Sequence, residues 1–179
     1  MNERRPRLEG KVAIVTGAGS RSEGTGNGKA TATLFAREGA KVVLVDIEIE
    51  RANETLADIE AEGGIASAFA ADVCSDEECK ALVDFAVSEY GRLDILDNNV
   101  GNSHRERVTE IALDDWDKIM TLNLKSMVLT SRHAIPRMVE TGGGSIINIS
   151  SISGIRSGKD PAYTASKAGV IGLTVSTAG

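Results

Sequence analysis

Short apolar segments alternate along this chain with stretches spaced like amphipathic helices, and this alternation limits the possible fold more than any other feature. The run Val42-Val43-Leu44-Val45 illustrates the apolar type, because an unbroken row of branched residues suits a strand that is buried on both faces. Strands that alternate with helices predict a parallel sheet covered by helices on both sides. We therefore expect an α/β fold with three layers around a doubly wound parallel sheet.

Five strands and the helices between them can be placed on the sequence. The strands are expected at residues 12–16, 41–45, 65–71, 93–97 and 145–149. The helices are expected at about 28–38, through 52–59 up to the Gly63-Gly64 pair, from an N-cap at Ser75 through residue 90, at 114–139, and from Tyr163 onward. Since no linker, repeat or low-complexity tract interrupts this order, residues 1–179 are expected to form one domain.

The composition indicates a soluble globular protein. The chain is 41% hydrophobic and 26% charged, and its net charge of −6 argues against a nucleic acid or an anionic membrane as partner. The first ten residues are rich in Arg and Glu and do not form a secretory signal. Apolar runs are too short to span a bilayer. These features predict a cytoplasmic protein.

The cysteines and histidines do not form the patterns of metal or redox sites. Cys74 and Cys79 have neither CxxC nor zinc-ligand spacing, so we expect two reduced thiols. His104 and His133 are not part of a cluster with metal-ligand spacing. The sequence therefore predicts no metal site.

Polar or glycine residues stand at the carboxyl end of every expected strand: Thr16-Gly17, Asp46, Asp72, Asn98-Asn99 and Ser150-Ser151. In open α/β sheets, ligands bind beyond these ends. Each of these residues taken alone would be an ordinary loop residue. Together, on one edge of the sheet, they predict a binding crevice.

The turn after the first strand is rich in glycine. It contains Gly17, Gly19, Gly24, Gly26 and Gly28, and the next expected helix begins there. Glycines allow the backbone to approach a pyrophosphate, and a helix N-terminus supplies N–H donors, although a merely flexible connection would look similar.

Asp46 closes the second strand, 18 residues after Gly28. A carboxylate at this place can accept hydrogen bonds from an adenosine ribose and would repel a 2′-phosphate, which favours NAD over NADP. An Asp after a strand is also a common turn residue.

Asn123 lies on or beside the apolar stripe of the long helix, near Ile119 and Met127. A buried amide must be hydrogen-bonded, either in a core network, at a helix kink or in a functional site.

Tyr163 and Lys167 share one helix face because they are four residues apart. A nearby ammonium favours the phenolate form, which lets a tyrosine exchange protons near neutral pH. The pair alone is a common pattern. Ser151, only 12 residues before Tyr163, supplies a strand-end hydroxyl that can converge on the same face.

These landmarks follow one another in an order that resembles the short-chain dehydrogenases/reductases over essentially the whole chain. The matching segments are Thr16-Gly17, Gly26-Asn27-Gly28, Asp46, Asp72-Val73, Asn98-Asn99-Val100-Gly101, Asn123, Asn148-Ile149-Ser150-Ser151, and Tyr163 with Lys167. The resemblance implies a Rossmann-type fold and hydride transfer between NAD(P) and an alcohol or a carbonyl compound.

The resemblance also implies a role for each matching residue. Tyr163 would be the general acid/base, Lys167 would assist it and hold the nicotinamide ribose, Ser151 (with Ser150 as second choice) would bind the substrate oxygen, and Asn123 would hold a relay water. The residues expected to meet the cofactor are Gly17, Gly19, Gly26, Asn27 and Gly28 at the pyrophosphate, Asp46 and Asn99 at the riboses, Asp72 and Val73 at the adenine, and Gly101, Tyr163 and Lys167 nearby.

The chain departs from the family's pattern at several places. Residues 21–25 are an insertion in the glycine-rich turn, where Arg21 could meet phosphate or be solvated. Val100 replaces an alanine, and Asp97 stands where the family has an apolar residue. Relatives usually continue with further strands and a substrate-closing segment, so we expect an NAD-binding domain that is incomplete at its C-terminus.

Three functions remain open on the sequence. The first is an oxidoreductase acting on a secondary alcohol or ketone with NAD(H), a homo-oligomer (dimer or tetramer) in its full-length form. The second is an NAD-binding module without turnover. The third is a non-redox member of the family, such as an epimerase or lyase.

Overall fold

The computed structural model describes residues 6–20, 24–156 and 159–178. Its strands are β1 (Val12–Thr16), β2 (Lys41–Asp46), β3 (Ile65–Ala70), β4 (Ile95–Asn98) and β5 (Ser145–Asn148). Its helices are α1 (Asn27–Arg37), α2 (Ile49–Ala61), α3 (Asp76–Tyr90), α4 (Leu113–Met120), α5 (Ser126–Glu140) and α6 (Pro161–Thr177), with a π-helical turn η1 (Thr121–Lys125) and a 3-10 turn η2 (Ile152–Gly154).

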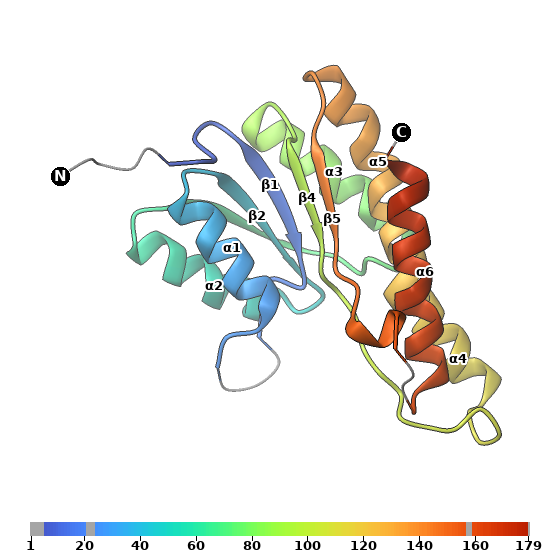
Figure 1. The fold of residues 1–179 in the computed structure, drawn as a ribbon. Helices are drawn as coiled ribbons and strands as arrows, with labels where there is room; N and C mark the ends of the chain where they lie inside the picture. Colours follow the sequence, from blue (N-terminus) through green and yellow to red (C-terminus); the bar gives the residue numbers. More distant parts are fainter. Residues whose placement is uncertain (1–5, 21–23, 157–158, 179) are drawn as a thin grey trace.

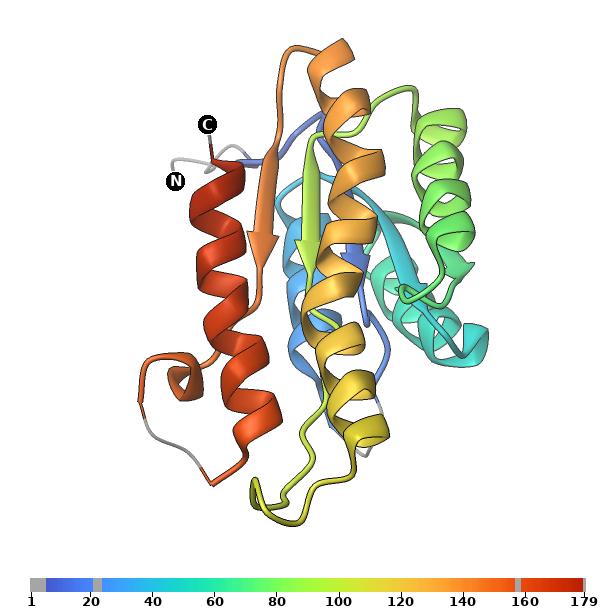
Figure 2. The same ribbon diagram turned by 90° about the vertical axis from the view of Figure 1, so that its right-hand side faces the viewer.

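The strands form one parallel sheet in the order β3-β2-β1-β4-β5. Helices α1 and α2 cover one face of this sheet, and α3 and α5 cover the other, with α6 beside α4 (Figures 1 and 2). The expected three-layer, Rossmann-type doubly wound sheet is thus confirmed. After β3 the chain crosses to the far side of β1, and the crevice that ligands use in such sheets opens between the ends of β1 and β4.

The core explains why the strands are apolar throughout. Ile14 faces α3 and α5, where it packs with Leu82 and Leu96, whereas the next residue, Val15, faces α1 and packs with Ala32. Because both faces are covered, neither set of alternating side chains meets water. Full burial of one such side chain stabilises the fold by about 1.5–3 kcal/mol.

The expected continuous helix over residues 114–139 is wrong in one respect. It consists of α4 and α5 joined by the π-helical turn η1, which contains Asn123. A π turn holds one residue more per hydrogen-bonded ring than an α turn, which changes the direction of the side chains within it. Asn123 lies fully buried there and forms three hydrogen bonds.

Helix α6 begins at Pro161, two residues earlier than expected. Proline suits the first helical position, because it lacks the N–H that would be unsatisfied there. The side chain of Asp160 caps the helix by accepting a hydrogen bond from the Tyr163 N–H. The N-cap expected at Ser75 is confirmed, since its Oγ accepts from the Glu78 N–H at 3.3 Å.

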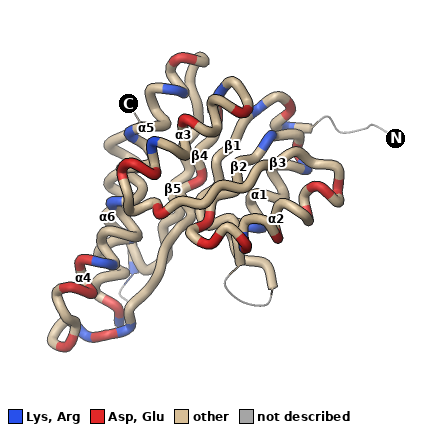
Figure 3. The backbone as a smooth tube through the Cα atoms, turned by 180° about the vertical axis from the view of Figure 1, so that it is seen from behind, with Lys and Arg blue, Asp and Glu red and all other residues tan. Residues whose placement is uncertain are grey.

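The loop between β4 and α4, together with α4, carries basic and acidic residues interleaved along the chain (Figure 3). Among them, Lys118 pairs with Asp115 at 2.7 Å, and His104 lies 3.2 Å from Glu106.

No helix in the described part of the chain is both long enough and apolar enough to cross a membrane.

Candidate active site

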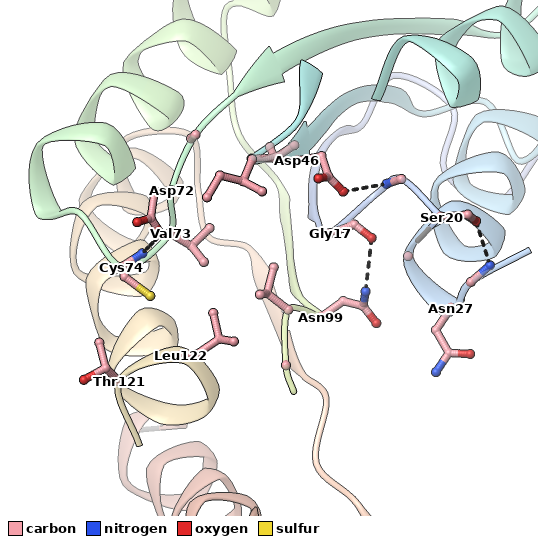
Figure 4. A pocket seen from close by; sticks show the side chains of 18 of the residues that line it. Gly17, Ser20, Asn27, Asp46, Asp72, Val73, Cys74, Asn99, Thr121 and Leu122 are labelled. Atoms are coloured by element: carbon pink, nitrogen blue, oxygen red, sulfur yellow. Dashed lines mark hydrogen bonds between the residues drawn. The ribbon is translucent and has the colours of Figure 1, made fainter. Parts of the chain in front are cut away.

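The ends of β1 and β4 are joined by hydrogen bonds at the centre of the sheet edge. The Thr16 hydroxyl accepts from the Asn99 N–H at 3.0 Å, and the Asn99 amide donates to the Thr16 carbonyl oxygen at 3.3 Å. The same amide donates to the Gly17 carbonyl oxygen at 3.4 Å (Figure 4). Asn99 therefore fixes the start of the glycine-rich turn relative to the neighbouring strand.

The turn comes so close to α1 that a side chain at Gly28 would not fit. A Cβ there would lie 2.0 Å from the Gly17 carbonyl oxygen and 2.7 Å from Nδ2 of Asn99. The N-cap of α1, Gly26, has no side chain to satisfy the first N–H groups of the helix, and these groups can bind an anion. The Gly26 N–H donates to Oγ of Ser20, a residue that the sequence analysis did not select. Arg21 lies outside the described residues.

Asp46, the last residue of β2, lies against this turn. Its Oδ2 accepts from the Gly19 N–H and its Oδ1 from the Glu48 N–H, both at 3.2 Å. The residue is 9% exposed, and its exposed part lines a cavity along the sheet edge. Asp46 thus holds the turn and presents a negative charge at the place expected for a ribose.

A cavity of about 1070 Å³ runs along the sheet edge from the turn to η1. Ligand pockets usually measure about 300–1,000 Å³, so this cavity suits a ligand as large as a dinucleotide. Ten of the predicted cofactor residues line it: Gly17, Gly19, Gly26, Asn27, Gly28, Asp46, Asp72, Val73, Asn99 and Gly101. The lining residues that the sequence analysis did not select include Ile47, Cys74, Thr121 and Leu122, because nothing in their local pattern distinguishes them.

The end of the cavity next to β3 is shaped by Asp72 and Val73. Oδ1 of Asp72 accepts from the Cys74 N–H at 2.8 Å, so its side chain folds back on its own turn (Figure 4). Val73 packs against Cys79 and Leu129. Both cysteines are free thiols, as expected, and burial raises the pKa of the Cys74 thiol to about 11.

A second cavity, of about 850 Å³, opens beside the first and shares Asn27, Asn99 and Gly101 with it. Tyr163 and Lys167 line it from α6. The Lys167 ammonium is 5.8 Å from the centre of the Tyr163 ring and donates to the Ile149 carbonyl oxygen at 2.7 Å. Burial lowers the pKa of Lys167, whose side chain is almost fully enclosed.

The two candidate serines differ in their hydrogen bonds, although both line this second cavity. The Ser150 hydroxyl donates to the Lys167 carbonyl oxygen at 2.7 Å, so its hydrogen is in use. Among the described residues, Oγ of Ser151 takes part in one hydrogen bond, which it accepts from the Ser153 N–H at 3.1 Å. Ser151 therefore retains a hydroxyl hydrogen that it can donate into the cavity.

Asn123 lies behind the cavity and does not line it. Its Oδ1 accepts from the Asn102 N–H at 2.8 Å, and its Nδ2 donates to the Asn102 carbonyl oxygen at 2.8 Å and to Oγ of Ser166 at 3.0 Å. Gly101 separates it from Lys167, since a Cβ at Gly101 would lie 3.3 Å from Oδ1 of Asn123 and 3.2 Å from Nζ of Lys167. The side chain of Asn123 thus supports the site from outside.

Comparisons with known proteins agree with this arrangement. The family model of the short chain dehydrogenases matches residues 11–179. The chain is 38% identical over 169 residues to a 3-oxoacyl-acyl-carrier-protein reductase of Thermotoga maritima, covering 94% of this chain and 67% of that protein. It is 37% identical over 174 residues to a cyclohexanol dehydrogenase of Acinetobacter, covering 96% of this chain and 67% of that protein.

Solved structures lead to the same family. A putative short-chain dehydrogenase/reductase from Burkholderia xenovorans superposes with a TM-score of 0.91 at 40% identity, covering 94% of this chain and 68% of that one. A 7α-hydroxysteroid dehydrogenase complexed with NADH and 7-oxo glycochenodeoxycholic acid gives a TM-score of 0.88 at 37% identity, covering 97% and 66%. The chain spans about two thirds of the length of these relatives. It belongs to the short-chain dehydrogenase/reductase family.

Proposed function

We propose that the protein transfers a hydride between NAD(H) and a secondary alcohol or ketone, with Tyr163 as the general acid/base. One observation carries this proposal: Tyr163, Lys167 and Ser151 line a single cavity that shares Asn27, Asn99 and Gly101 with the larger cavity along the sheet edge. A phenol, a buried ammonium and a hydroxyl beside a space of dinucleotide size support proton transfer coupled to hydride transfer.

The residues along the larger cavity fit NAD. The absence of a side chain at Gly28 and the uncapped start of α1 suit a pyrophosphate, and Asp46 suits an adenosine ribose. When bound, NAD supplies the acceptor for the hydride of an alcohol, and NADH the donor to a ketone. The relative whose structure contains NADH and a 7-oxo bile acid supports a ketone as one of the substrates. We also propose NAD over NADP, because the Asp46 carboxylate would repel a 2′-phosphate.

The side chains of Tyr163, Lys167 and Ser151 would each have a different role in proton transfer. The Tyr163 phenol gives a proton to a ketone oxygen or takes one from an alcohol. The Lys167 ammonium, held beside it by the Ile149 carbonyl, stabilises the phenolate through its charge. Ser151 donates its hydroxyl hydrogen to the substrate oxygen, where charge develops during the reaction. Because the side chain of Asn123 is occupied, the relay water assigned to this residue would have to be held by its main chain.

A Tyr163→Phe variant tests the proposal. We expect turnover to fall by about 10²–10⁴-fold, the usual contribution of a positioned acid/base, while affinity for NAD stays within about twofold of wild type. The measurements are NADH absorbance with a panel of secondary alcohols and ketones, and calorimetric titration with NAD. Tyr90→Phe is the matched control, because Tyr90 is the only other tyrosine and its hydroxyl bonds Ser67 away from both cavities.

The outcomes separate the candidate functions. Turnover retained in Tyr163→Phe contradicts the acid/base role, and loss of NAD binding in that variant indicates a structural tyrosine instead. Wild-type protein that binds NAD but converts none of the panel would be a binding module. Conversion of a substrate without net formation or loss of NADH would indicate a non-redox reaction.

A further inference from the structure

Asp160 lies between α6 and the loop that follows β4, and its side chain contacts both. Its Oδ1 accepts from the Tyr163 N–H and its Oδ2 from the His104 N–H, each at 3.0 Å. Its carbonyl oxygen accepts from the Thr164 N–H at 2.9 Å. One carboxylate thus joins the first turn of the tyrosine helix to a residue 56 positions away in the chain.

The carbonyl group of Tyr163 is connected to the same loop through side-chain hydrogen bonds. The Tyr163 carbonyl oxygen accepts from the Ser166 hydroxyl at 2.8 Å, and Ser166 accepts from the amide of Asn123. Asn123 in turn holds both main-chain groups of Asn102. The N–H and the carbonyl of Tyr163 are therefore each connected to the loop over residues 102–104, by two separate routes.

This loop also forms a wall of the second cavity. Asn102, Ser103 and Arg105 line it, as do Asp160 and Tyr163. A substrate that fills the cavity would therefore meet both the loop and the phenol. The position of Tyr163 relative to the loop then decides whether the substrate oxygen reaches the phenol in a reactive geometry.

We propose that Asp160 is a positioning residue that sets Tyr163 against the loop over residues 102–105, a role that rests on the proposed function of Tyr163. The residue type supports the assignment. A helix N-cap needs one acceptor, which Ser, Thr or Asn supplies as well as Asp. The two N–H groups here need two acceptor oxygens in one short side chain, which a carboxylate has and an amide or hydroxyl does not.

The substitutions Asp160→Asn and Asp160→Ser separate positioning from capping. Either variant can still accept from the Tyr163 N–H, but Asn turns an NH₂ group toward the His104 N–H and Ser has no second oxygen. We expect both to unfold within about 2 °C of wild type, with kcat lowered at least about 10-fold and NAD affinity unchanged, because small displacements of reacting groups lower rates by up to about 10²-fold. Asp160→Ala, which removes the cap as well, should lower both Tm and kcat.

A second measurement does not depend on turnover. Amide hydrogen exchange at His104 should become at least about 10-fold faster in Asp160→Asn, whereas the Tyr163 amide stays protected, because its acceptor remains. Ser75→Ala is the control for a lost helix cap elsewhere: it removes the cap of α3 and should lower Tm without lowering kcat.

The results distinguish this proposal from the one on which it rests. Suppose that the wild-type protein is active and that Asp160→Asn or Asp160→Ser has the kcat as well as the Tm of wild type. Asp160 is then only a helix cap, and the positioning role is refuted. Unchanged exchange at His104 in Asp160→Asn refutes the tie to the loop. If wild-type protein shows no turnover while exchange at His104 accelerates as expected, the proposed function fails and the tie is structural.

Discussion

Asp97 carries a carboxyl group in the interior of the sheet, where nothing in the described residues stabilises its charge. It is 1% exposed, and neither oxygen has a hydrogen-bond partner in that part of the chain. Its neighbours across the strands are Val15 in β1 and Ile147 in β5. Like Val15, it faces α1, whose Lys29 and Arg37 are paired elsewhere, with Asp58 and Glu62.

Burial raises the pKa of Asp97 from its ordinary value of 3.8 to about 6. A difference of about two pKa units corresponds to about 3 kcal/mol of unfolding free energy. The unfolded chain releases this proton at lower pH than the folded protein does, so ionisation favours unfolding. The Asp97 contribution to stability therefore falls as pH rises above about 4, and the full loss is reached above about pH 6.

An Asp97→Asn variant keeps the shape of the side chain and removes the titration. Unfolding free energies of the variant and of wild type are measured by urea denaturation at a series of pH values. We expect the difference between them to shift by about 3 kcal/mol in favour of the variant between about pH 4 and pH 7.5. The control is Glu54→Gln, which changes an exposed carboxyl on α2 and should follow wild type at every pH. Wild-type and Asp97→Asn curves that stay parallel across this range would refute the reasoning.

Two further substitutions test the proposed cofactor site. Gly28→Ala should weaken NAD binding at least about 10-fold by calorimetry, because its Cβ would lie 2.0 Å from the Gly17 carbonyl oxygen and α1 must move. Gly172→Ala, with open space around the new Cβ, should leave binding unchanged. Asp46→Ala should lower the ratio of NAD to NADP affinity, measured by fluorescence titration of NADH and NADPH. A ratio equal to that of wild type would count against a role for Asp46 in cofactor choice.

The lining of the larger cavity could be predicted in good part from the sequence, because one physical rule brings these residues together. Parallel strands end at the same edge of a sheet, so residues that follow different strands must converge there. Asp46, Asp72 and Asn99 are far apart in the chain, yet each follows a strand and each lines the same cavity. The apolar runs that identify the strands therefore also identify side chains that line this cavity.

The contacts of Asp160 and Asn123 that hold Tyr163 in place could be predicted only in part. The Asp160-Pro161 pair marks a helix start locally, although the expected helix began two residues later. The second contact of Asp160, with His104, joins segments 56 residues apart, and no periodicity in either segment indicates it. Asn123 was recognised as a polar residue near an apolar stripe, but its partners depend on the π turn, which the helical spacing does not reveal.

The end of β4 shows why Asp97, unlike the two asparagines that follow it, lacks a side-chain hydrogen bond among the described residues. Successive side chains of a strand point to opposite faces. Asn98 therefore faces α5, where it accepts from Thr130 at 2.6 Å, and Asn99 faces the turn, where it bonds Thr16 and Gly17. Asp97 shares the face of Asn99 but lies deeper, where the backbone groups of the sheet already bond one another.

The loss of stability that follows ionisation of Asp97 is therefore separate from the two cavities at the sheet edge. The residue lines neither cavity, and apart from the main-chain ladder of the sheet the hydrogen bond found for it in the described chain is the one that its carbonyl oxygen accepts from the Thr16 hydroxyl. Asp97→Asn keeps that main-chain group, so the Thr16 hydroxyl stays in place to receive the Asn99 N–H. NAD affinity should then be unchanged while stability above about pH 6 increases, and a variant that gained stability but lost NAD binding would show that the charge itself supports the turn.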